Sequence, residues 1–178
     1  MSRRIPLMLL LLSVLTGAAT NRLSILIVDD DGPADFSTIQ AAVDAAQPGD
    51  TVLVKPGTYQ ESVLIENKTD LTVRGTHRDS VRVLRIDQQS GQVMIVFVSN
   101  SERITMQDMH IVGAGVADAG VAINLSTDIT VRRTLMTGMG ASFVSAGRSQ
   151  HLRIVDNKFV VGAEFDQAGP SPPYLDFL

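Results

Sequence analysis

Hydrophobic and polar residues alternate over much of this chain, but one short stretch near the start has a different period. Four apolar residues recur there at the spacing of one helix face: Ile39, Ala42, Val43 and Ala46. Ser37 and Gln40 have the spacing of a capping box, and Pro48 and Gly49 end the segment. Because so short a helix is unstable alone in water, the pattern predicts a capping helix near 37–47 that lies on a body of strands.

Four later segments repeat one pattern, in which aliphatic residues at alternate positions follow a polar turn. They are residues 68–76, 101–109, 126–134 and 149–157. Alignment on Leu71, Ile104, Ile129 and Leu152 gives spacings of 33, 25 and 23 residues, and the longer first spacing predicts an extra loop around 76–92. Repeats of this length indicate a solenoid, in which stacked coils share one core.

A further strand precedes the aligned one in each of the later coils. These strands are predicted at 93–98, 121–125 and 143–146. In this register two sets of residues stack, the first being Val96, Val121 and Val144 and the second Val98, Ile123 and Ala146. The sequence therefore predicts an all-β parallel solenoid of about four to five coils over residues 20–165.

The two ends of the chain differ from the repeats. Two arginines precede an apolar run from Leu7 to Leu15 that is too short to span a bilayer, and small residues follow it. We therefore expect residues 1–19 to be a signal peptide, with a retained anchor as the alternative. Removal of this segment leaves no integral membrane span and makes the protein secreted or periplasmic. The Pro-rich tail, 166–178, either caps the last coil with its late apolar residues or stays free of it.

Residues 35–63, DFSTIQAAVDAAQPGDTVLVKPGTYQESV, resemble the N-terminal cap and first coil of a known superfamily. It is the pectin lyase-like superfamily of right-handed parallel β-helix proteins, and pectinesterases open with a similar phrase. The resemblance implies a right-handed β-helix with an N-terminal capping helix. It does not imply one reaction, because this superfamily places its chemistry in later coils. Periplasmic copper-accessory β-helix proteins also resemble the chain.

Charge and composition limit the partners. The formal net charge is −4, and it becomes −6 if the two arginines of the leader are removed. A net-acidic protein without a basic run is a poor nucleic-acid binder, and it repels polyanions unless local arginines or a bridging cation intervene. Cysteine is absent, which excludes disulfides and thiolate sites. Tryptophan is also absent, which argues against stacking platforms for neutral sugars.

The same register predicts a charged column. Four residues beyond the aligned aliphatic positions stand Gly75, Asp108, Arg133 and Asp156, and one position earlier stand Arg74, Gln107, Arg132 and Val155. Parallel strands are about 4.8 Å apart, so Asp108, Arg133 and Asp156 should form an acid–arginine–acid column. We take these three as the candidate catalytic residues. The candidate substrate-binding residues are Arg132, Arg74, Gln107 and Arg153. The plain alternative is a surface ion-pair ladder.

Three functions remain open from the sequence. The first is an exported β-helix protein, non-catalytic or degenerate, that binds an extracellular polysaccharide or a surface partner. The second is a polysaccharide lyase or pectinesterase-like enzyme acting on polyuronates, with Ca²⁺ as a possible cofactor. The third is a periplasmic copper-handling protein, which would use soft ligands: Met106, Met109, His110, Met136 and Met139. We read Asp29-Asp30-Asp31 as a solvated turn, because it lacks the spacing of an EF-hand loop.

Overall fold

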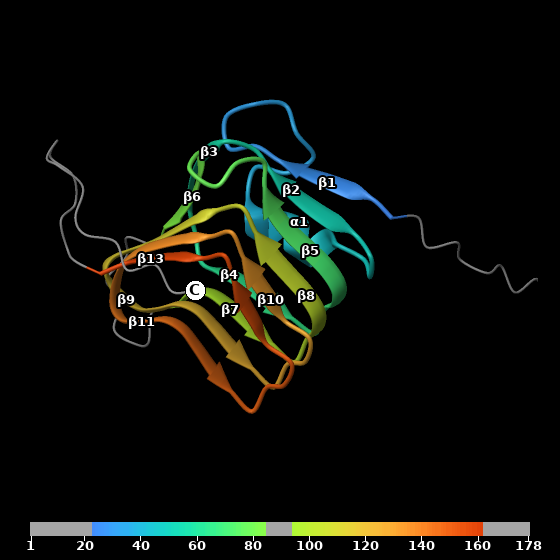
Figure 1. The fold of residues 1–178 in the computed structure, drawn as a ribbon. Coiled ribbons are helices and arrows are strands. Elements are labelled where there is room, and N and C mark those ends of the chain that lie inside the picture. The colour runs from blue at the N-terminus through green and yellow to red at the C-terminus, as the bar shows by residue number, and fades with distance from the viewer. Residues whose placement is uncertain (1–22, 85–93, 162–178) are drawn as a thin grey trace, which may run out of the picture.

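The structure, a computed structural model, describes residues 23–84 and 94–161. Within these ranges the chain forms strands, turns and one helix, α1 (Ile39–Ala45). All the strands pair in parallel and wind through about five turns of a solenoid (Figure 1). The predicted fold class, a right-handed parallel β-helix with a capping helix, is confirmed. The described helix is neither long nor apolar enough to cross a membrane.

One sheet, which we call sheet A, forms one side of every coil. In spatial order its strands are β1 (Ile25–Val28), β2 (Thr51–Val54), β5 (Thr69–Gly75), β8 (Glu102–Gln107), β10 (Thr130–Arg132) and β12 (Arg153–Val155). Figure 1 shows these strands following one another from blue β1 to the brown strands of the last coils. Of the aligned aliphatic positions, Leu71 and Ile104 lie in β5 and β8, and Ile129 and Leu152 directly precede β10 and β12.

The second sheet covers the other two sides of the coil. Side B contains β3 (Gly57–Gln60), β6 (Val81–Leu84), the start of β9 (His110–Asn124), the start of β11 (Leu135–Gly147) and β13 (Lys158–Val160). Side C contains β4 (Val63–Glu66), β7 (Met94–Ser99) and the ends of β9 and β11. The sequence predicted only side C as strands beside sheet A. In the later coils sides B and C are one continuous strand, with register shifts between Thr137 and Ser142.

The predicted register is confirmed on both sheets. Leu71 pairs with Ile104 on sheet A, and the next inward column is Val73, Met106, Val131 and Ile154. On side C the two predicted stacks are present: Val96, Val121 and Val144, then Val98, Ile123 and Ala146. In the middle coils these side chains are almost completely buried. The core is therefore a set of aliphatic columns that run along the solenoid axis.

Corners of the coil are made by non-glycine residues with positive φ. They form three columns: Asn67, Asn100, Leu125 and Arg148; then Asp70, Arg103, Asp128 and His151; then Asp108, Arg133 and Asp156. The first two columns flank a serine ladder, in which Ser126 Oγ accepts from Ser101 N–H and Ser149 Oγ accepts from Ser126 N–H. Since the left-handed conformation turns the backbone within one residue, it directs these side chains to the outside, where they stack.

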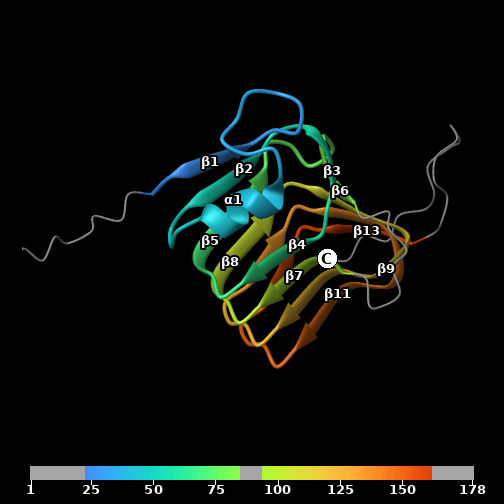
Figure 2. The same ribbon diagram turned by 180° about the vertical axis from the view of Figure 1, so that it is seen from behind.

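Helix α1 closes the N-terminal end of the solenoid, where it contacts β1, β2 and β4 (Figure 2). Its cap differs from the prediction: Thr38, not Ser37, accepts from the N–H of Ala41, at 3.3 Å. Gln40 does not complete a capping box either. The carboxylate of Glu61 accepts from the N–H groups of residues 39 and 40, at 2.8 and 2.9 Å. The cap was mispredicted because this acid comes from the first coil, far away in the sequence.

The last described coil is less buried than the others. Ile154 of β12 is 37% exposed, whereas its column neighbours in the middle coils, Val73, Met106 and Val131, are buried. The predicted signal peptide, 1–19, and the Pro-rich tail, 166–178, lie outside the described residues. Of the predicted extra loop around 76–92, residues 76–80 form a turn between β5 and β6, and residues 85–93 are not described.

Candidate functional site

The corner between sheet A and side B brings the predicted acid–arginine column together. Arg133 donates from Nε to Oδ1 of Asp108 at 2.7 Å and from Nη2 to Oδ2 at 2.8 Å. Asp156, one coil further on, lines the same cleft and contributes to the electrostatic field at Arg133. The stacking therefore places all three side chains at one site, but the direct ion pair joins Asp108 to Arg133.

The ion pair determines the state of Asp108. The hydrogen bonds from Arg133 hold the pKa of this carboxyl below its usual value, and a hydrogen bond from Gln107 adds to the effect. Both carboxylate oxygens are engaged as acceptors. Asp108 is therefore ionised at neutral pH and occupied, so it suits a positioning role better than the role of a general base.

A second column lies beside this pair on the outer face of sheet A. Arg74, Gln107 and Arg132 are in register on β5, β8 and β10. Gln107 is 5% exposed; its Oε1 accepts from Arg132 Nε at 2.7 Å, and its Nε2 donates to Asp108 at 2.9 Å. Among the described residues, neither Arg74 nor Arg132 has a carboxylate partner. Neither guanidinium group is therefore held in a direct ion pair within the described ranges, although the charge of Arg132 also acts on Asp108.

A loop that the sequence did not assign to the site forms one wall of it. The corner between β5 and β6 contains residues 76–80, whereas the next coil turns with residues 108–109 alone. The carbonyl of His77 accepts from the N–H groups of Ser80 and Val81, which makes the loop compact. Four of its residues line a cleft of about 470 Å³ with the acid–arginine column: Thr76, His77, Arg78 and Asp79. The 33-residue first spacing was the available signal for this wall.

A second charged corner lies at the other end of the strands of sheet A. Its column is Asp70, Arg103, Asp128 and His151, each one position before an aligned aliphatic residue. Arg103 Nη2 donates to Asp70 Oδ2 at 3.0 Å, and His151 Nδ1 lies 3.2 Å from Asp128 Oδ1. The same alignment could have found this column, but it was applied only to positions after the aliphatic residue.

Arg153 does not join the first cleft. It lines a second cleft, of about 490 Å³, at the Asp128–His151 corner. Arg153 therefore lies apart from the other three substrate-binding candidates, Arg74, Gln107 and Arg132. The physical reason is register: Arg153 pairs with Thr130 and lies two residues before Val155, the position that matches Arg132.

The three adjacent acids near the N-terminus lie close together, with one ligand oxygen of each within 4.8 Å of the others. Asp29 is paired with the ammonium group of Lys55 at 3.1 Å, and Asp30 accepts from the N–H of Thr58 at 3.0 Å. The lysine and the backbone therefore satisfy much of this cluster, in line with its interpretation as a turn.

The methionines of the copper hypothesis lie mainly in the core. Met106, Met109 and Met136 are at most 2% exposed, and Met139 packs against the same core cluster. Such burial is typical of methionine as a core-filling residue. The copper-handling role stays a prediction that these positions do not favour.

His110 leads to a prediction on acid stability. It is mostly buried, and its Nε2 lies 2.9 Å from Thr137 Oγ1. Burial, aided by Arg82, lowers the pKa of His110 from 6.5 to about 4. As the pH falls, His110 is protonated in the unfolded chain at about pH 6.5 but in the folded protein only near pH 4. The contribution of His110 to stability is therefore full above pH 6.5 and declines towards pH 4. With allowance for partial exposure, the free energy of unfolding should fall by about 2 kcal/mol through this group.

Urea unfolding at pH 7 and at pH 4.5 measures this loss. The variant His110→Gln keeps a polar group near Thr137 and cannot titrate, while every other acid-sensitive group is retained. We expect its loss of stability between the two pH values to be smaller than that of the wild type. Equal losses would show that His110 is not the acid-sensitive group.

Comparisons with known proteins give a fold and no closer relationship. No family model matches the chain, and no curated protein matches it either. Among solved structures, a pectin methylesterase mutant in complex with a hexasaccharide has a TM-score of 0.57 and 16% identity over 75% of this chain and 49% of its own. Pectin methylesterase from carrot has a TM-score of 0.57 and 17% identity over 75% and 52%. An alginate lyase from Paenibacillus sp. str. FPU-7 has a TM-score of 0.53 and 12% identity over 69% and 44%.

These matches show the fold of the chain. The chain has the right-handed parallel β-helix fold of the pectin lyase-like type, as the resemblance of residues 35–63 implied. It spans about half the length of the solved structures that it matches. At this level of identity the likeness concerns the fold, and the function has to be argued from the clefts described above.

Proposed function

We propose that this protein binds an acidic polysaccharide, one whose sugars carry carboxylates, in the cleft at the corner of sheet A and side B and on the adjoining outer face of sheet A. The observation that carries the proposal is the pair of arginines, Arg74 and Arg132, which have no carboxylate partner among the described residues. A guanidinium group binds a carboxylate through two parallel hydrogen bonds, which makes arginine the suited residue for this ligand.

The geometry of the face supports a carboxylated chain rather than a single small anion. Arg74 and Arg132 are two strands apart on one column, so their backbones are separated by about 10 Å. The network from Arg132 through Gln107 and Asp108 to Arg133 orients these side chains before a ligand arrives. Because the formal net charge of the protein is −4, an acidic ligand is attracted only where such arginines are local.

The compared structures agree with this class of ligand. They are pectin methylesterases and an alginate lyase, and one of them is in complex with a hexasaccharide. We extend the proposal to location, with residues 1–19 as an export signal and the mature chain secreted or periplasmic. The same chain would then meet its ligand outside the cytoplasm.

A catalytic role is the second candidate, because three carboxylates (Asp79, Asp108 and Asp156) and two arginines line one cleft. In that role Asp156 is the better base, since Asp108 is occupied by Arg133. The alternative predicts turnover of pectate, alginate or methylated pectin, with Ca²⁺ dependence if it is a lyase. Release of unsaturated sugars or of methanol measures it. Binding without either product would support the non-catalytic proposal. Turnover by the wild type that Asp156→Asn abolishes would show instead that the protein is an enzyme.

The test of binding uses two variants of the arginine column and one control. Arg74→Ala removes a charge without removing a hydrogen bond to another described residue, and Arg132→Ala removes the second charge. Each should weaken binding of polygalacturonate by about tenfold or more, the effect of a lost charge-assisted hydrogen bond. Calorimetric titration at fixed salt measures the affinity.

Arg82→Ala is the matched control, because Arg82 is an exposed arginine on side B. It removes the same charge and should leave the affinity nearly unchanged. Equal losses in all three variants would mean that only net charge matters. That result, or no binding of any acidic polysaccharide by the wild type, would contradict the proposed site.

A further inference from the structure

We infer that the second charged corner, where Asp128 and His151 meet, is a second subsite for the same carboxylated polysaccharide. The ligand then lies across sheet A, parallel to its strands, from one corner of the coil to the other. This inference rests on the proposed function and adds to it the direction in which the chain lies and a second place that holds a sugar.

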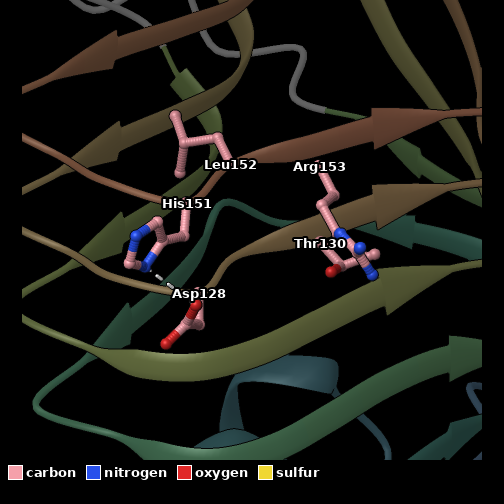
Figure 3. A pocket seen from close by; sticks show the side chains of 5 residues that line it. All are labelled: Asp128, Thr130, His151, Leu152 and Arg153. Atoms are coloured by element: carbon pink, nitrogen blue, oxygen red, sulfur yellow. Dashed lines mark ion pairs between the residues drawn. The ribbon is translucent and has the colours of Figure 1, made fainter.

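The corner has the groups that an acidic sugar needs. Figure 3 shows the imidazole of His151 beside the carboxylate of Asp128, and the guanidinium of Arg153 beside the side chain of Thr130. Side chains of His151 and Asp128 are 70% and 48% exposed, so both are open to a ligand. Within the described part of the chain Arg153 has no carboxylate partner.

Each group has a distinct role toward a sugar carrying a carboxylate. Arg153 presents the donors for the carboxylate. Thr130 and Asp128 present a hydroxyl and a free carboxylate oxygen for sugar hydroxyls. Leu152 turns away from these groups (Figure 3) and packs against the core, which fixes the backbone between His151 and Arg153. The subsite is therefore built on a packed element rather than on a free loop.

The two clefts are joined by one short strand. Thr130 belongs to the second cleft, and Arg132, two residues later on β10, belongs to the arginine column beside the first cleft. From Asp128 to Arg133 the chain extends over about 16 Å. Between the corners the outer face of sheet A carries a ladder of threonines in register: Thr51, Thr72, Thr105 and Thr130. A polysaccharide that crosses this face meets these hydroxyl groups beside the neighbouring column of Arg74, Gln107 and Arg132.

A path along the corner itself is less favourable. In the corner column of Asp70, Arg103, Asp128 and His151, the guanidinium group of Arg103 is already paired with the carboxylates of Asp70 and Glu102. The available guanidinium groups are instead Arg132 and Arg153, which lie on the neighbouring strands β10 and β12. Among the described residues, the guanidinium groups without a carboxylate partner therefore lie on a path across the sheet, from one cleft to the other.

A length series of oligogalacturonates, from the disaccharide to the hexasaccharide, tests this direction by calorimetric titration at fixed salt. For the wild type, the affinity should rise by about tenfold or more at the length that reaches both clefts, because the second contact is then intramolecular. In Arg153→Ala the short oligomers should bind as in the wild type, and the rise with length should disappear. His151→Asn should reduce the rise in the same way.

The outcomes separate this inference from the function on which it rests. Loss of affinity at every length in Arg132→Ala, with a loss confined to the long oligomers in Arg153→Ala, supports both. If Arg132→Ala weakens binding while Arg153→Ala and His151→Asn bind every length as the wild type does, the second subsite is wrong and the first stands. No binding by the wild type at any length overturns the proposed function itself. Arg82→Ala serves again as the charge-matched control.

Discussion

Replacement of Gly75 by alanine is expected to destabilise the protein by about 3 kcal/mol, the upper range for overpacking in a well-packed site. A Cβ atom at Gly75 would lie 2.0 Å from the backbone oxygen of Asp108 and 3.1 Å from Val81. The clash is with backbone, which cannot rotate away as a side chain does. Asp108 is itself a corner residue with φ of 59°, so relief of the clash would displace the corner that carries the first cleft.

Urea unfolding of Gly75→Ala and of Gly147→Ala at pH 7 measures this effect. Gly147 is the matched control, because the nearest atom to its Cβ would be Oδ1 of the Asn124 side chain, at 3.4 Å, an ordinary contact. The control should change the free energy of unfolding by less than about 1 kcal/mol. Similar stability in the two variants would show that the coils at this corner are not as closely stacked as the structure has them.

Removal of a central core side chain should have a comparable effect. Ile104 is fully buried, pairs with Leu71 and lies in the middle of an aliphatic column. Ile104→Ala removes buried methyl and methylene groups and leaves a cavity between coils, so we expect a loss of about 3 kcal/mol or more. Thermal and urea unfolding at pH 7 both report this change.

The same substitution at the open end of the solenoid provides the comparison. Ile154 is 37% exposed in the last described coil, and Ile154→Ala should cost about 1 kcal/mol or less, because little buried area is lost. The difference between the two variants measures how burial increases from the last coil to the middle. Equal losses would contradict the gradient of burial along the core.

Alternating charge along both corners explains why acids and arginines stack so closely. Asp108 and Arg133 form one pair, and Asp70 and Arg103 form another on adjacent coils. The side chains of these pairs are partly exposed, so each pair contributes little to stability. Their larger effect is to prevent like charges from meeting at neighbouring corners. Arg74 and Arg132, which have no carboxylate partner in the part of the chain that the structure describes, remain for a ligand.

Within the candidate site, the sequence located the pair of Asp108 and Arg133 because both follow an aligned aliphatic residue by the same number of positions. It named Arg153 as a substrate-binding candidate without a position, and the register places this residue at the opposite corner, two positions before the one that matches Arg132. The wall at residues 76–80 was visible only as extra length. Spacing reports that a loop exists, but it contains no information on the side to which the loop folds.

For this protein, the order of apolar residues was sufficient to determine the parallel stacking, the register of the coils and the presence of a capping helix. Each of these follows from local alternation and from near-constant spacing, which any chain with a shared core must satisfy. Two features were decided only by the tertiary structure: the cap that Glu61 supplies to α1 and the third side of each coil. Each depends on where a left-handed corner turns the backbone and on contacts between residues more than 20 positions apart, and neither is specified by the local pattern of the sequence.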